Sequence, residues 1–110
     1  MVTFALPDES YALITGETGR TIHRTYGLTI GAGEWHALQR AVVTEGKHVV
    51  TCDEPTATSL LEWFEKAFEA AKGAHGVFGE PSTVLSSCRR ASAAIRAAIA
   101  DVRPPGSAIR

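Results

Sequence analysis

The sequence predicts an α+β domain in the order βββαβαα: a three-stranded antiparallel meander, a helix, a fourth strand and two packed C-terminal helices. Two observations lead to this prediction. Apolar and polar residues alternate along much of the first 30 residues, which is typical of half-buried strands. After residue 33 the apolar spacing becomes that of helices, and it is clearest near the C-terminus. Helices are expected to cover one face of the sheet.

The predicted meander consists of three short segments. Val2, Phe4 and Leu6 alternate with smaller or polar residues and define the first strand. Residues 11–15 form a second apolar run, and residues 16–19 contain two glycines suited to a hairpin loop. The third strand is expected within residues 21–30. Its face toward solvent or a partner would carry Thr21, His23, Thr25 and Thr29.

A helix and a strand are expected next. Trp35, Leu38 and Val42 are spaced along one face of a helix over about residues 34–45, and Gly46 is suited to end it. Residues 47–52 are rich in β-branched side chains and short enough to be a fourth strand.

The second helix has the strongest pattern in the chain. Ser59 and Glu62 have capping-box spacing, and Lys72 followed by Gly73 is typical of a helix end. An apolar stripe runs between these ends and consists of Leu60, Leu61, Phe64 and Phe68. Residues 73–81 are expected to be a loop whose Val77 and Phe78 pack into the core.

The third helix is expected to start at Ser82 or Thr83 and to end near Arg103, before Pro104. Apolar and small residues recur along it with coiled-coil-like spacing, which predicts close helix packing within the domain or across a dimer. These residues are Leu85, Cys88, Ser92, Ile95, Ile99 and Val102, flanked by Ala91, Ala94 and Ala98. A single domain over residues 1–103 is therefore expected, with residues 104–110 as a flexible tail.

Composition limits the class of protein. The chain has 110 residues, a formal net charge of -1 and 45% hydrophobic residues, which fits one small globular domain and argues against wholesale disorder. The N-terminal residues lack the pattern of a signal peptide, and no apolar run is long enough to span a membrane, so a cytoplasmic protein is expected. Cys52 and Cys88 lack metal-ligand spacing and are expected to be buried thiols.

Charge is divided unevenly along the chain. Residues 53–83 hold six acids and two bases, whereas residues 84–110 hold one acid and five bases. Arg89, Arg96 and Arg103 recur every seven residues, with Arg90 beside them, so they form a candidate binding stripe for phosphate. The alternative is that these arginines pair with carboxylates of the preceding helix, namely Glu62, Glu65 and Glu69.

Few residues suggest catalysis. His23, Glu34 and His36 are the candidates, because they supply the acid and base groups of a small metal-independent hydrolase or nuclease. The Ser86–Cys88 segment has no identifiable base partner, so it is not expected to contain a nucleophile.

Ligand-binding motifs are incomplete. Residues 16–21 are similar to the end of a phosphate-binding loop but lack its first glycine and its lysine, so a hairpin turn is favoured. Residues 31–33 contain half of a dinucleotide fingerprint and are expected to be a strand-to-helix turn. His48, Cys52 and Asp53 lack the spacing of a zinc site. No metal and no cofactor are therefore expected.

Three hypotheses about function are consistent with these sequence features. The leading hypothesis is a small non-enzymatic protein-binding module, a regulator, inhibitor or immunity-type protein that acts on a protein partner or as a homodimer. Exposed strand edges and alanine-rich helix surfaces are both suited to such association. The second hypothesis is a nucleic-acid-binding regulator that uses Arg89, Arg90, Arg96 and Arg103. The third is the small hydrolase or nuclease; none of the three requires a membrane.

Overall fold

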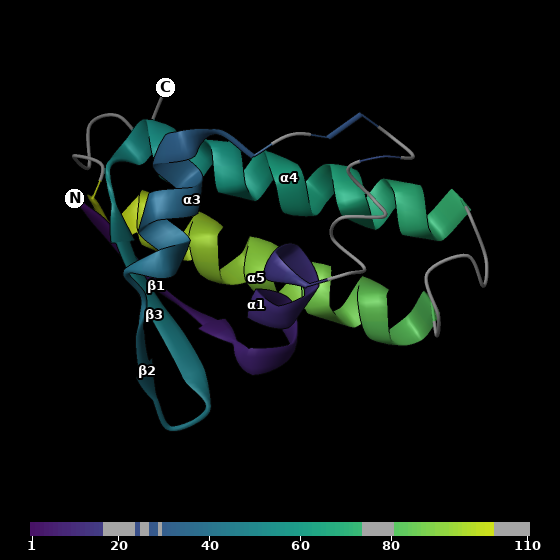
Figure 1. Ribbon diagram of the computed structural model, residues 1–110, viewed down its shortest axis with the longest axis horizontal. Helices are drawn as coiled ribbons and strands as arrows, with labels where there is room; N and C mark the ends of the chain where they lie inside the picture. The colour runs from purple at the N-terminus through teal and green to yellow at the C-terminus, as the bar shows by residue number, and fades with distance from the viewer. Residues whose placement is uncertain (17–23, 25–26, 29, 74–80, 103–110) are drawn as a thin grey trace.

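The computed structural model describes residues 1–16, 24, 27–28, 30–73 and 81–102, and it confirms an α+β fold. Within these residues a three-stranded antiparallel sheet is combined with four helices (Figure 1). In chain order the elements are β1 (Val2–Pro7), α1 (Asp8–Thr15), α3 (Ala32–Gln39), β2 (Val42–Thr44), β3 (Lys47–Cys52), α4 (Glu54–Gly73) and α5 (Pro81–Val102). The order is therefore βααββαα, which differs in detail from the predicted one.

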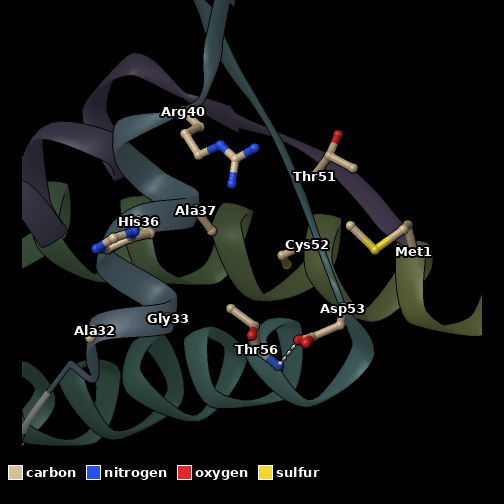
Figure 2. Close-up of a pocket in the computed structure, with 10 residues that line it drawn as sticks. All are labelled: Met1, Ala32, Gly33, His36, Ala37, Arg40, Thr51, Cys52, Asp53 and Thr56. Atoms are coloured by element: carbon tan, nitrogen blue, oxygen red, sulfur yellow. Dashed lines mark hydrogen bonds between the residues drawn. The ribbon is translucent and has the colours of Figure 1, made fainter.

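The sheet has the strand order β1-β3-β2, so the predicted fourth strand lies at its centre. β1 pairs with the whole of β3, from Val2 opposite Cys52 to Pro7 opposite Lys47. β2 pairs only with residues 47–49. Beyond residue 49, α3 lies beside β3 on the side where β2 pairs with residues 47–49 (Figure 2).

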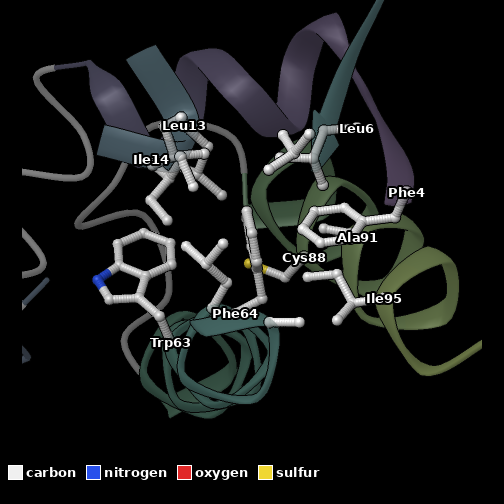
Figure 3. Close-up of a cluster of buried hydrophobic side chains, with 14 of the residues drawn as sticks. Phe4, Leu6, Leu13, Ile14, Trp63, Phe64, Cys88, Ala91 and Ile95 are labelled. Carbon is white, nitrogen blue, oxygen red and sulfur yellow. The ribbon is translucent and has the colours of Figure 1, made fainter. Parts of the chain in front are cut away.

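The two faces of the sheet differ in cover. Val2, Phe4 and Leu6 point to the same face as Val50 and are all buried. α5 packs against this face of β1, and α4 packs along α5. Figure 3 shows how Phe64 from α4 meets Phe4 and Leu6 from the strand and Cys88, Ala91 and Ile95 from α5. As predicted, helices cover one face of an antiparallel sheet.

The prediction of a second strand at residues 11–15 is wrong. These residues belong to α1, which begins directly after Pro7. Asp8 and Glu9 lie in its first turn, where negative charge is favourable beside the helix dipole. Ser10, Leu13 and Ile14 have the i, i+3, i+4 spacing of a helix and are all buried. The Pro-Asp-Glu-Ser residues at 7–10 are typical of a turn between two strands, but they equally favour a helix start.

The predicted helix over residues 34–45 is correct only in its first half. α3 runs from Ala32 to Gln39, and residues 42–44 form strand β2. Val42, Val43 and Thr44 are consecutive β-branched residues, which favours extended backbone. Glu45 and Gly46 both have positive φ, at 49° and 75°, as a type I′ hairpin turn requires. Gly46 therefore belongs to a hairpin turn and does not end a helix.

The C-terminal helices match the prediction more closely. α4 ends at Gly73 as expected but begins at Glu54, because Asp53 caps it: its Oδ1 accepts a hydrogen bond from the Thr56 amide at 2.9 Å. Ser59 and Glu62 thus lie inside the helix and form no capping box.

α5 spans Pro81–Val102 and has a largely buried seam. Cys88, Ile95 and Ile99 are buried, as are the flanking Ala91 and Ala98. Leu85 and Ser92 are half-buried, whereas Val102 is exposed. The seam packs within the chain, against α4 and β1.

Several predictions concern residues that the structure does not describe. The third strand at residues 21–30 falls largely among them, including Thr21, His23, Thr25 and Thr29. The loop residues Val77 and Phe78 and the tail over residues 104–110 also lie outside the described residues.

Candidate binding surfaces

β2 is an exposed edge strand. In the described part of the chain it pairs with β3 on one side and with no strand on the other. The hairpin of β2 and β3 projects beyond the helices (Figure 1). Val42 is 65% exposed and Val43 is 64% exposed, although each is an apolar residue. The sequence contains a signal for this hairpin, because two β-branched runs flank Glu45 and Gly46.

The backbone of Val43 faces away from β3. Thr44 and Lys47 flank the two-residue turn, which makes them a hydrogen-bonded pair of the ladder. Such pairs alternate with non-hydrogen-bonded pairs in an antiparallel ladder, and Val43 opposite His48 is the next pair. The N–H and C=O of Val43 therefore point outward, where another strand could bind them.

The second face of the sheet is polar at one end and apolar at the other. Thr3 and Thr51 lie opposite each other, and their hydroxyl oxygens are 3.1 Å apart in a hydrogen bond. Ala5, Val49 and Val42 form a row across the three strands; the first two are half-buried and Val42 is exposed. This row joins the exposed edge at Val42, so the edge and the sheet face form one continuous surface.

A pocket of about 360 Å³ lies between α3 and β3 (Figure 2). We call it the α3–β3 pocket. Its polar lining consists of His36 from α3, Arg40 directly after that helix, Thr51 from β3, and Asp53 and Thr56 at the start of α4. Ala37 and Cys52 are its buried residues, and Met1, Ala32 and Gly33 complete the lining.

Hydrogen bonds and burial set the charge states of Asp53 and Cys52 in this pocket. Hydrogen bonds from the side chain and the backbone of Thr56 hold the pKa of Asp53 below its ordinary value of 3.8, so this carboxylate is ionised at neutral pH. Burial raises the pKa of the Cys52 thiol to about 11, and Asp53 and Glu34 add to the effect. Cys52 is therefore a neutral thiol and not an activated nucleophile.

The arginines of α5 lie beside partners in the fold. Arg96 forms an ion pair with Glu65 of α4, and Arg90 Nη1 lies 3.4 Å from Glu9 Oε2 of α1. The Arg89 guanidinium lies 5.6 Å from the centre of the Phe68 ring. A second pocket, of about 300 Å³, is lined by Glu65, Phe68, Glu69, Arg89, Ser92 and Arg96. Arg103 lies outside the described residues.

Two of the three catalytic candidates are described, and they line different pockets. His36 is exposed and lines the α3–β3 pocket. Glu34 is half-buried and lines a different pocket, with Glu62 and Lys66 among its neighbours. His23 lies outside the described residues. Burial raises the pKa of Cys88 to about 12, so this thiol is neutral at neutral pH.

The other motifs considered in the sequence are the histidine at position 48 and the two glycine-containing segments. His48 Nε2 lies 2.6 Å from Asp8 Oδ1, and its ring stacks on Tyr11 with centroids 3.8 Å apart. The described residues contain no group of three or more His, Cys, Asp or Glu side chains that could hold a metal ion. Gly31 precedes α3 as expected for a turn into a helix. Residues 17–21 of the loop-like motif lie outside the described residues.

Comparison of the chain with protein-family models, curated proteins and solved structures finds no match. No helix in the described part of the chain is long and apolar enough to cross a membrane.

Proposed function

We propose that this chain is a small non-enzymatic protein-binding module of the regulator, inhibitor or immunity type, and that it binds through the outer edge of β2. The observation that carries the proposal is the exposure of Val42 and Val43, at 65% and 64%, on a strand whose outer edge has no strand partner among the described residues. An exposed strand edge offers backbone donors and acceptors to an extended segment of another chain.

The chemistry of the edge favours addition of one strand. The outward N–H and C=O of Val43 supply the hydrogen bonds, and the valine side chains supply apolar contacts on both faces of the sheet. Lys47 and Glu45 flank the edge at the hairpin end, and β2 is only three residues long. Short edges with nearby charges limit uncontrolled aggregation, so a defined complex is favoured over an open fibre.

The first partner to test is a second copy of this chain, joined by antiparallel pairing of two β2 edges. The measurement is size-exclusion chromatography with light scattering over a range of concentrations, with absorbance followed at two wavelengths. Wild type is expected to form a dimer free of nucleic acid. Val43→Lys is expected to be monomeric, because a charged side chain would be desolvated in the interface.

Two controls accompany this experiment. Thr3→Lys places the same charge at an exposed position of the far strand β1 and is expected to leave the dimer intact. Circular dichroism would show that Val43→Lys is folded. A wild-type monomer at every concentration would reject self-pairing, and equal dimerisation of wild type and Val43→Lys would place the interface elsewhere.

Binding of nucleic acid through the arginines of α5 is the second candidate. Arg89 and Arg90 are exposed, which favours it, but Glu65 and Glu9 compete with phosphate for Arg96 and Arg90. The same chromatography would detect bound nucleic acid from its absorbance ratio. Loss of that nucleic acid in Arg89→Gln, together with a steep dependence on salt, would favour this candidate over strand pairing.

A further inference from the structure

Arg40 has an unusual position among the described arginines that line a pocket. Its guanidinium points across the α3–β3 pocket toward β3, as Figure 2 shows, and it has no ion-pair or hydrogen-bond partner among the described residues. Arg96, which lines the other arginine-bearing pocket, pairs with Glu65. A guanidinium presents a planar set of donors that fits a carboxylate or a phosphate in a bidentate manner. Arg40 is therefore available to a ligand anion.

Asp53 and Thr56 lie toward the opposite end of the same pocket (Figure 2). Oδ1 of Asp53 accepts the Thr56 amide at 2.9 Å, which fixes the carboxylate in place. An ionised carboxylate has about four acceptor positions on its two oxygens, so the hydrogen bonds from the backbone and side chain of Thr56 leave acceptor capacity. The pKa of Asp53 lies below 3.8, and the group stays charged at neutral pH. This end of the pocket suits a ligand's ammonium or N–H group.

The middle of the pocket separates the two charges. Ala37 and Cys52 are buried there, and Cys52 is a neutral thiol. Thr51 and His36 add polar groups at the sides. Ligand sites combine apolar walls with a few placed polar groups, and 360 Å³ falls near the lower end of the usual range of about 300 to 1,000 Å³. The pocket is thus sized for a small molecule and not for a folded partner.

We propose that the α3–β3 pocket binds a small zwitterion, an amino acid or a related ω-amino acid, with its carboxylate on Arg40 and its ammonium group on Asp53. The argument depends on both charges. A simple anion would meet repulsion from Asp53, and a simple amine would meet repulsion from Arg40. A ligand that carries both charges is attracted at both ends, so its affinity exceeds that of either half.

The test uses nuclear magnetic resonance titration of the full chain with acetate, ethylammonium, glycine, γ-aminobutyrate and aminohexanoate. Shift changes are expected for amides of residues 36–40 and 51–56, and at least one amino acid is expected to bind about tenfold more tightly than acetate. The series varies the spacing of the charges, so the preferred member reports the distance that the pocket selects.

Two variants assign the roles of the charges. Arg40→Gln is expected to weaken binding of the best amino acid about tenfold and to remove acetate binding. Asp53→Asn keeps an efficient helix cap, because Asn and Asp are similar in that role, and it is expected to remove the preference for the amino acid over acetate. Arg90→Gln is the matched control outside the pocket and should bind like wild type.

Each outcome decides the proposal. Loss of binding in Arg40→Gln and loss of zwitterion preference in Asp53→Asn would support it. Absence of shifts with every probe, or equal binding by wild type and Arg40→Gln, would overturn it. Equal affinity for acetate and for all the amino acids would overturn the role of Asp53. Val43→Lys leaves this pocket unchanged, so failure of the proposed strand pairing and failure of this site are distinguishable.

Discussion

The pair of helices α4 and α5 and the β2–β3 hairpin use their apolar side chains in opposite ways. Along the helix pair Phe64, Leu60, Cys88 and Ile95 are all fully buried within the chain. On the hairpin Val42 and Val43 remain about two thirds exposed. The helix pair therefore stabilises the domain, whereas the hairpin retains apolar surface that contributes little to folding. The hairpin thus carries the surface that we propose for binding.

The largest expected effect is on the helix pair. Phe64→Ala would leave a cavity at a fully buried position and should lower the free energy of unfolding by about 3 to 5 kcal/mol, measured by urea denaturation. Val42→Thr on the hairpin is the matched control, because it changes an exposed side chain and should alter stability by less than about 0.5 kcal/mol. Similar losses in the two variants would break the comparison.

A smaller effect is expected where α1 meets α5. The buried hydroxyl of Ser10 donates a hydrogen bond to the Ser87 carbonyl oxygen at 2.7 Å. Ser10→Ala removes this bond and should destabilise the domain by about 1 kcal/mol. Thermal unfolding would measure the change, with Ser10→Cys as a variant of similar size and weaker hydrogen bonding. An unchanged melting temperature in Ser10→Ala would show that α1 is not held by this bond.

The ion pair between Arg96 and Glu65 should matter less. Both side chains are well exposed, at 64% and 38%, and exposed pairs typically contribute about 0.2 to 1 kcal/mol. A double-mutant cycle with Arg96→Gln and Glu65→Gln would measure the coupling, and high salt should reduce it. A coupling well above 1 kcal/mol would mean that the exposed part of the helix pair is as important as its core.

The smallest effect is a pH dependence at the start of α4. The folded pKa of Asp53 is lowered below 3.8, so its charge stabilises the fold at pH values above the unfolded pKa. That stability is lost as the pH falls through the folded pKa. Asp53→Asn removes this charge, so it should be slightly less stable than wild type at neutral pH, match wild type at low pH, and show a flatter acid side of the stability profile. A profile identical to that of wild type would show that the cap does not depend on charge.

Much of the fold follows from local patterns, and the exceptions have physical causes. The two long helices were predictable because their apolar periodicity extends over many residues, whereas β1 was indicated by a short apolar alternation and β3 by a run of β-branched residues. α1 was missed because Pro7 to Ser10 fits a turn as well as a helix start, and the buried bond from Ser10 to Ser87 depends on a contact 77 residues away. β2 was missed because the helical spacing of Trp35, Leu38 and Val42 was extended past the end of α3.

The candidate sites were predictable only in part. The sequence indicated the arginines of α5 as a binding stripe and, as the alternative, their pairing with carboxylates of α4. In the fold Arg96 pairs with Glu65 of α4. The sequence did not indicate the α3–β3 pocket, because Arg40, Thr51 and Asp53 are brought together by the hairpin and by the position of α3 beside β3. The link between His48 and Asp8 joins positions 40 residues apart and has no local signal.

The most direct test of the binding role that we propose for β2 is amide hydrogen exchange of Val43 as a function of protein concentration. In the free chain this outward amide should exchange rapidly. If two β2 edges pair, protection of the Val43 amide should rise with protein concentration. In Val43→Lys the backbone amide at position 43 should stay unprotected at every concentration. The exchange rates of the β1 amides should not change with concentration. A Val43 amide that exchanges at the same rapid rate in the dimer and the monomer would contradict the account.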